Sequence, residues 1–278
     1  MSNSASTSLK ACIRNIAKQK NIPAQVVLQN FMFERFLIRL SQSEYKDKFV
    51  LKGGMLISAI VGLDTRSTMD LDATIRDIHL TEETLLNALE IICTIPVDDK
   101  VAFKLRAMDP IRKDDPYGGF CVKLEAKYEK IVVPLSIDVS TGDAITPQAI
   151  RYSFREIFDE TNSFELWTYN IETVLAEKVE TVLNRGVFNT RTRDYYDIYI
   201  LNKTQEFNPA LFREALSATA AHRKSTASIS DTKRIIETIE SSEVLKRLWE
   251  KYQKQFYYAS NISYNEVMQS LRSVLALD

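Results

Sequence analysis

The stretch 66-RSTMDLDATIRD-77 places two carboxylates, Asp70 and Asp72, in a run that otherwise has the composition of a buried strand. Because side chains alternate along a strand, a strand over 67–75 puts both carboxylates on one face and an apolar set on the other. Burying a charge costs several kcal/mol unless it is paired or bound to a metal. The pattern fits either a solvated strand face, the favoured explanation for an isolated pair, or a site of oxygen ligands suited to Mg²⁺.

A third carboxylate stands at the end of the predicted strand 131-IVVPLSIDV-139. Asp138 falls on the more polar face of this strand, although a solvated position is favoured for it when it is taken alone. Pro134 inside the run predicts an edge strand or a bulge. Three acids on adjacent strands could hold two metal ions for an in-line phosphoryl displacement.

A glycine pair precedes these acids, in 49-FVLKGGMLISAIVGL-63. The pattern predicts a short strand, the turn Lys52-Gly53-Gly54 and then an apolar helix. Glycines let backbone N–H groups approach a ligand, and a helix N-terminus favours an anion, so this turn is a candidate phosphate site as well as a plain tight turn. Arg66 and Ser67 could add donors to the same phosphate tail.

Two later segments add charged candidates. In 172-ETVLAEKVETVLNRG-186, Lys178 lies on a predicted helix and is either a solvent-facing lysine or one that reaches a triphosphate. In 191-RTRDYYDIYIL-201, Asp194 opens an aromatic-rich helix. An acid in the first turn of a helix is also expected from the helix dipole alone.

Composition excludes several classes of protein. The chain has 278 residues, of which 45% are hydrophobic and 26% charged, and a net charge of −1 gives no overall basic field for nucleic acid. Its three cysteines are far apart without a CxxC spacing, which disfavours disulfides and zinc and fits a cytoplasmic location. Since no apolar run reaches the length of a membrane span, no membrane association is expected.

The segments predict a mixed centre between helical ends. Residues 8–41 read as helical with a break at Ile22-Pro23, the region after 141–147 reads as a loop to about 168, and the remainder is helical from Ile171. We therefore predict one domain over 1–165 and a helical domain over 166–278. Its basic clusters at 185–193 and 246–254 are either solvated helix faces or an RNA surface.

Taken together and in order, four patches resemble the AbiEii/AbiGii toxin family of nucleotidyltransferases, which includes the MenT toxins. They are 50-VLKGG-54, 66-RSTMDLD-72, 137-IDVSTGD-143 and the segment from 175-LAEKVETVLNRG-186 through TRTRDYYDIY to residue 199. The resemblance implies an α+β fold with a DNA polymerase β-like nucleotidyltransferase core, a small mixed sheet with flanking helices, and a mostly helical C-terminal domain. Gly54 stands where the family more usually has serine.

The resemblance also implies roles for individual residues. Asp70 and Asp72 match the metal ligands of the family, Asp138 matches the third core acid of the superfamily, and Lys178 and Asp194 match an essential lysine and aspartate. Lys178 would bind the nucleotide together with residues of the glycine turn and of the segment before the acids: Lys52, Gly53, Gly54, Arg66 and Ser67.

The implied reaction is Mg²⁺- or Mn²⁺-dependent attack by an acceptor hydroxyl on the α-phosphate of an NTP, with pyrophosphate leaving. Asp138 or Asp194 would take the proton. GTP or CTP as substrate, the 3′ end of tRNA or another RNA as acceptor, and an antitoxin in a toxin–antitoxin or phage abortive-infection system are expectations from the same resemblance. Two alternatives remain: an enzyme that nucleotidylates protein, like an AMPylase, and a non-catalytic nucleotide-binding interaction module.

Overall fold

The computed structural model describes residues 5–111 and 118–277, which form two compact units. Unit 1 comprises the chain up to Gly142 together with Ile150–Thr168, and unit 2 comprises Asp143–Ala149 together with the chain from Tyr169. The predicted boundary between residues 165 and 166 stays a prediction of domain organisation. None of the helices in the described ranges combines the length and apolar character that crossing a membrane requires.

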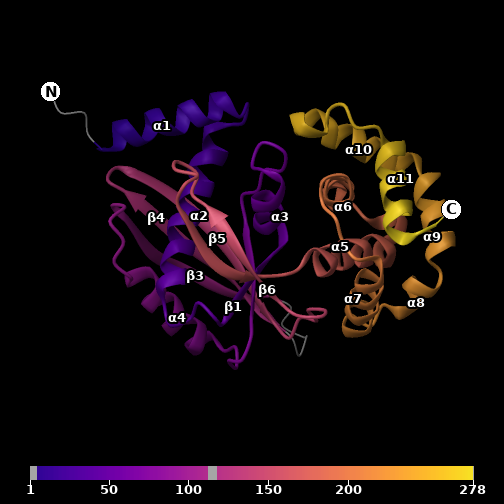
Figure 1. Cartoon of the computed structure of the whole chain (residues 1–278), viewed down its shortest axis with the longest axis horizontal. Coiled ribbons are helices and arrows are strands. Elements are labelled where there is room, and N and C mark those ends of the chain that lie inside the picture. Colours follow the sequence, from indigo (N-terminus) through magenta and orange to yellow (C-terminus); the bar gives the residue numbers. More distant parts are fainter. Residues whose placement is uncertain (1–4, 112–117, 278) are drawn as a thin grey trace. The chain divides into compact units, whose positions relative to one another are not determined.

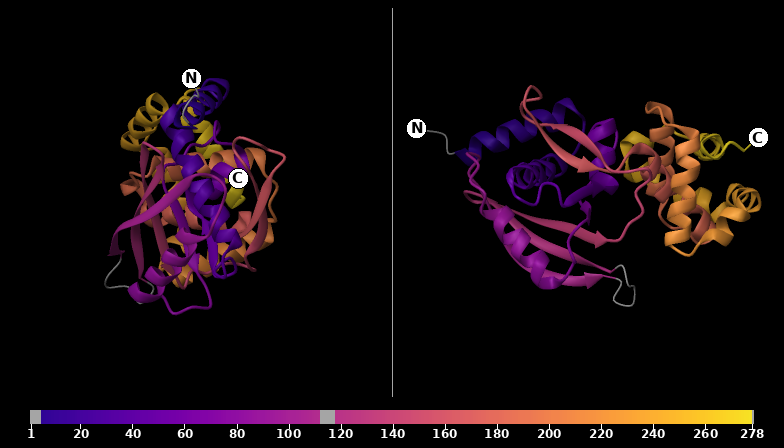
Figure 2. Two further views of the ribbon diagram at one scale, coloured as in Figure 1. Left: turned by 90° about the vertical axis from the view of Figure 1, so that its left-hand side faces the viewer. Right: turned by 60° about the horizontal axis from the view of Figure 1, so that its bottom comes forward.

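Unit 1 is built on a seven-stranded mixed sheet in the order β3-β4-β5-β2-β1-β7-β6 (Figures 1 and 2). The β2–β5 and β1–β7 pairs are parallel and the other neighbours are antiparallel. The strands are β1 Phe49–Lys52, β2 Leu71–Ile75, β3 Val101–Ile111, β4 Gly119–Tyr128, β5 Ile131–Thr141, β6 Ile150–Arg155 and β7 Ser163–Thr168.

Four helices belong to this unit: α1 Ala5–Gln19, α2 Ala24–Gln42, α3 Gly53–Val61 and α4 Glu82–Thr94. The predicted break at Ile22-Pro23 falls between α1 and α2, and Thr81 caps α4 by accepting from Thr84 N–H. Helix α2 packs against β3, β5, β7 and α4 and buries most of its length. On β4 and β5, buried apolar residues alternate with more exposed ones, among them Lys123, Lys127 and Val132, so the other face of these strands is open to solvent.

Three sequence expectations were wrong in detail. The region read as a loop to about 168 contains the antiparallel pair β6–β7, and β7 is held in the sheet by β1, a partner more than 100 residues earlier. The strand predicted over 67–75 begins only at Leu71. Pro134 lies in β5, an interior strand, but β2 pairs with β5 only from Ile137 onward. The missing N–H of Pro134 therefore falls where β5 has no second neighbour.

Unit 2 is helical, which confirms the expectation for the C-terminal part of the fold. The helices are α5 Ile171–Arg185, α6 Thr192–Thr204, α7 Pro209–His222, α8 Thr226–Ser230, α9 Thr232–Glu240, α10 Glu243–Gln255 and α11 Tyr264–Leu275, with short 3₁₀ turns at Gly186–Phe188 and Tyr257–Ala259. Gly186 ends α5, with a φ of +51°. Aromatic side chains, among them Tyr196, Trp249 and Tyr252, fill the core.

Candidate active site

Two of the predicted carboxylates are direct neighbours across the sheet of unit 1. Asp72, the second residue of β2, pairs with Asp138 of parallel β5 and with Lys52 of antiparallel β1. Neighbouring strands lie about 4.8 Å apart, so the two acids share one face of the sheet at adjacent positions. Lys52 turns toward β5, where its Nζ donates to Ser140 Oγ at 2.8 Å.

The glycine turn closes over Asp72. A Cβ atom added at Gly53, whose φ is +65°, would collide with the Asp72 carboxylate. The Gly54 N–H, at the start of α3, points to Asp72 Oδ2 at 3.4 Å. The first turn of α3 thus faces the carboxylate directly, and Gly53 is required both for the backbone conformation and for the space.

Asp138 has an unsatisfied oxygen at this place. Its Oδ1 atom is buried and has no hydrogen-bond partner among the described residues. The pKa of Lys123, on β4, is raised first by a hydrogen bond with the Cys121 thiol and further by the charges of Asp138 and Asp70. A buried carboxylate oxygen without a partner is costly, and a cation would remove that cost.

Asp72 and Asp138 fit a divalent cation whose remaining ligands come from a substrate. Within residues 5–111 and 118–277, no three acidic, histidine or cysteine side chains are gathered as a complete metal cage. Mg²⁺ is usually bound by one or two carboxylates plus substrate phosphates and water, rather than by an all-protein cage. The pair Asp72 and Asp138, with Asp70 nearby, matches that mode of binding.

Asp70 lies just outside the strand and is exposed. Arg66 was expected to donate to a phosphate, but it is only 1% exposed. Its Nη1 donates instead to Ser67 O at 2.6 Å. A Cβ at Gly54 would lie 3.1 Å from Arg66 Nη2. Arg66 therefore supports the first turn of α3 from inside.

In unit 2 the structure brings Lys178 and Asp194 together. Lys178 Nζ lies 2.9 Å from Asp194 Oδ1 and 3.1 Å from Asp197 Oδ2, and Arg191 Nε lies 2.9 Å from Asp194 Oδ2. The side chains of Asp194 and Asp197 are 1% and 0% exposed, so Lys178 balances buried charge. The sequence analysis did not single out Asp197 as a site residue, although the spacing in 194-DYYD-197 places both acids on one helix face.

The basic clusters at 185–193 and 246–254, expected to be either solvated helix faces or an RNA surface, make some of their contacts within unit 2. Arg191 pairs with Asp194, Lys246 pairs with Glu243 at 2.8 Å, and the Arg193 guanidinium lies over the Phe256 ring. The helix faces that carry them are nevertheless exposed at Arg185, Lys251 and Lys254.

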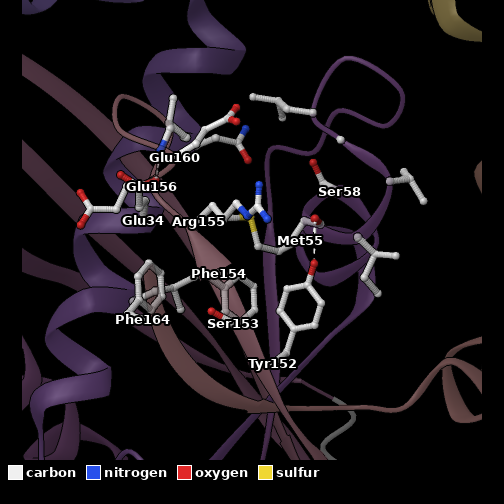
Figure 3. A pocket seen from close by; sticks show the side chains of 18 of the residues that line it. Glu34, Met55, Ser58, Tyr152, Ser153, Phe154, Arg155, Glu156, Glu160 and Phe164 are labelled. Carbon is white, nitrogen blue, oxygen red and sulfur yellow. Dashed lines mark hydrogen bonds between the residues drawn. The ribbon is translucent and has the colours of Figure 1, made fainter. Parts of the chain in front are cut away.

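A separate cavity of about 530 Å³ in unit 1 is lined by α1, α2, α3 and the β6–β7 hairpin (Figure 3). Tyr152 closes one side by donating to Ala59 O at 3.0 Å. Glu34 lines the cavity, and burial raises the pKa of its carboxyl to about 7 although Arg35 and Ile157 N–H bond to it. Neither Asp72 nor Asp138 lines this cavity, so it is distinct from the carboxylate pair.

Three solved structures are similar to this chain. A candidate nucleotidyltransferase from H. pylori has 19% sequence identity and a TM-score of 0.51, and the match covers 91% of this chain and 96% of that one. JHP933 from Helicobacter pylori has 18% identity and a TM-score of 0.48, with coverage of 91% and 92%. An antigenic nucleotidyltransferase-like protein from Paracoccidioides brasiliensis has 14% identity and a TM-score of 0.43, with coverage of 72% and 91%.

At these identities the likeness to the first of these structures shows the fold alone. None of the curated proteins compared with the chain matches it. The family described as the nucleotidyl transferase AbiEii toxin of type IV toxin–antitoxin systems, in contrast, matches residues 35–274, which span both units. This chain therefore belongs to the AbiEii family of toxins and is a nucleotidyltransferase.

Proposed function

We propose that the protein transfers a nucleotide from an NTP to an acceptor hydroxyl, at the carboxylates of unit 1. The acceptor oxygen forms a bond to the α-phosphorus while the bond to the β-phosphate oxygen breaks and pyrophosphate leaves. Asp70, Asp72 and Asp138 would hold Mg²⁺ or Mn²⁺, which supplies charge neutralisation at the transferred phosphate. The glycine turn with Lys52, Gly53 and Gly54, and Ser67 nearby, would position the triphosphate.

One observation carries this proposal: Asp138 keeps a buried carboxylate oxygen without a partner among the described residues, beside Asp72, whose own carboxylate lies against Gly53. A solvated strand face does not require a buried unpaired carboxylate oxygen. The same observation favours Asp138 over Asp194 as the group that takes the acceptor's proton. Asp194 is already bound by Lys178 and Arg191.

Lys178 and Asp194 belong to the proposal as groups required for transfer. Their burial and pairing within unit 2 show that the lysine is not a simple surface residue. Lys178 as a nucleotide-binding group and Asp194 as its essential partner follow from the family resemblance. Arg66 enters as a support of α3, because its guanidinium is buried.

The acceptor that we favour is RNA, at the 3′ end of tRNA or of another transcript, with GTP or CTP as donor. The resemblance to the MenT toxins motivates this choice, and membership of a type IV toxin family implies an antitoxin made alongside the toxin. Nucleotidylation of a protein hydroxyl is the second candidate, because the same carboxylates would serve either acceptor.

The test is incubation of the purified protein with Mg²⁺ and each α-labelled NTP in turn, together with total RNA or total protein. We expect label in a tRNA-sized band with one or two of the four NTPs, and its loss in Asp72→Ala and Asp70→Ala. Removal of the metal with a chelator should abolish the label, and Mn²⁺ should restore it. Glu165→Ala, which removes an exposed acid on β7, is the matched control and should keep full activity.

Each other result has a distinct meaning. Label only in protein would replace RNA with a protein acceptor. Wild-type rates in Asp70→Ala and Asp72→Ala would exclude the proposed site. NTP binding without Mg²⁺ and without any label or pyrophosphate would favour a non-catalytic interaction module.

A further inference from the structure

The four residues before β2 have no strand partners, yet each of their backbone carbonyls accepts a side-chain hydrogen bond. Ser67 O accepts from Arg66 Nη1 at 2.6 Å, and Asp70 O accepts from Thr68 Oγ1 at 3.2 Å. The other two carbonyls are held from a different element, helix α2. Side chains thus replace the sheet ladder over the segment 67–70, which delivers Asp70.

The donors from α2 are two consecutive amides, Gln29 and Asn30. Gln29 Nε2 donates to Met69 O at 2.8 Å, and Asn30 Nδ2 donates to Thr68 O at 2.9 Å. Both residues are buried, at 7% and 3% exposure. Asn30 Nδ2 also donates to Val26 O, one turn earlier in α2, at 2.9 Å, so its amide is fixed on the helix side as well.

These contacts bear on the position of Asp70. The carboxylate is exposed, and no hydrogen bond of its side chain is among those found in the described residues, so its location depends on the backbone that carries it. A buried carbonyl without a donor costs free energy, and a segment that lacks both a ladder and its donors would adopt other conformations. Hydrogen bonds behind a metal ligand orient it and raise the affinity for the metal.

We propose that Gln29 and Asn30 are positioning residues, which hold the segment 67–70 so that the Asp70 carboxylate meets the metal ion shared with Asp72. This inference rests on the proposed function, in which Asp70 is a metal ligand. It assigns a positioning role to helix α2, whose two amides donate to the backbone of the segment.

The variants are Gln29→Met and Asn30→Leu, which keep the approximate volume and remove the donor. Hydrogen exchange measured by mass spectrometry reports the segment through the Asp70 amide, whose N–H donates to Thr68 Oγ1 at 3.4 Å. We expect this amide to exchange at least about tenfold faster in the variants, while peptides from β5 stay unchanged. Binding of Mn²⁺ with a non-hydrolysable NTP, followed by electron paramagnetic resonance, should weaken by about 10- to 100-fold.

Glu34→Gln is the matched control. Glu34 lies on the same helix, is equally buried at 5% exposure, and bonds to Arg35 and Ile157 N–H instead of to the segment. It should change stability without changing the exchange of the Asp70 amide or the affinity for Mn²⁺. If Asn30→Leu fails to fold, Gln29→Met alone tests the positioning role. The Gln29 amide donates to Met69 O of the segment, whereas the Asn30 amide also donates to Val26 O within α2.

The outcomes separate this inference from the function on which it rests. Unchanged exchange and a Mn²⁺ affinity within twofold of the unaltered protein would overturn the positioning role. If the unaltered protein binds no Mn²⁺ with the nucleotide, the proposed metal site is wrong instead. Unchanged exchange in the variants would then still show that Gln29 and Asn30 do not hold the segment 67–70. Faster exchange together with weaker Mn²⁺ binding, absent in Glu34→Gln, would support the role.

Discussion

At Gly53 the chain leaves β1 with a φ of +65° and turns into α3 directly against Asp72. Two requirements meet at this residue, since a left-handed backbone strains any L side chain and a Cβ would occupy the space of the carboxylate. Gly186 shares the positive φ, at +51°, but a Cβ there would meet no atom within 4 Å. A comparison of the two positions therefore distinguishes the cost of the positive φ from the cost of crowding the Asp72 carboxylate.

Gly53→Ala and Gly186→Ala test this difference. Each should lose about 1–2 kcal/mol of stability from the backbone conformation. Only Gly53→Ala should also displace Asp72, and we expect its rate of nucleotide transfer to fall about 100-fold or more, as for other misplaced catalytic groups. Urea denaturation and the labelling assay measure the two effects. Equal activity in both variants would mean that the carboxylate does not need the space.

At the level of elements, α5 and α6 are joined through buried ions as well as apolar packing. Lys178 of α5 contacts two acids of α6, Asp194 and Asp197. Periodicity alone suggested a solvated lysine, because the sequence does not show which face of α5 meets α6. Once the helices pack, the lysine is enclosed and its two acids depend on it.

Lys178→Met should accordingly destabilise the protein by about 3–5 kcal/mol, since it removes the cation that contacts two buried carboxylates. The double variant Lys178→Met/Asp197→Asn should recover part of this loss, because one acid becomes neutral. Lys203→Met, an exposed lysine in the last turn of α6, should change stability by less than about 0.5 kcal/mol. Urea denaturation measures all three. A loss below about 1 kcal/mol in Lys178→Met would contradict the buried ion pair.

At the scale of the whole molecule, the chain passes between the two units more than once. Asp143–Ala149 belongs to unit 2, and the following strands return to unit 1. Asn170, the N-cap of α5, fixes this passage: its side chain accepts from Thr173 N–H and donates to Thr146 O at 2.8 Å and to Gln148 O at 3.0 Å. One residue thus caps a helix and fastens a distant segment to the same unit.

Asn170→Ala should therefore lower the stability of the protein by more than the loss of a helix cap alone. We expect about 2–4 kcal/mol, against about 1 kcal/mol for Asn208→Ala, whose side chain caps α7 through Ala210 and Leu211 N–H. Hydrogen exchange of residues 143–149 should rise in Asn170→Ala alone. If the two variants lose the same stability and residues 143–149 stay protected, the fastening role of Asn170 is wrong.

Local signals predicted those parts of the fold that are encoded within a few residues. Alternation identified β5, and the Pro23 break separated α1 from α2. The β6–β7 hairpin was missed because its pairing with β1 is not visible in its own sequence. For the site, the order of acids and glycines could be read directly, while Gln29 and Asn30 carry no local signal that separates them from ordinary helix residues.

The sequence by itself determined the class of the fold and the family, and it supplied the candidate site residues, because these depend on residue type, spacing and order along the chain. Tertiary structure alone decided that Asp72 and Asp138 become neighbours, that Arg66 and Lys178 are buried, and that side chains of α2 hold the segment before Asp70. The physical reason is that burial and hydrogen-bond partners belong to pairs of elements distant in the chain, and they exist only once the sheet and helices have packed.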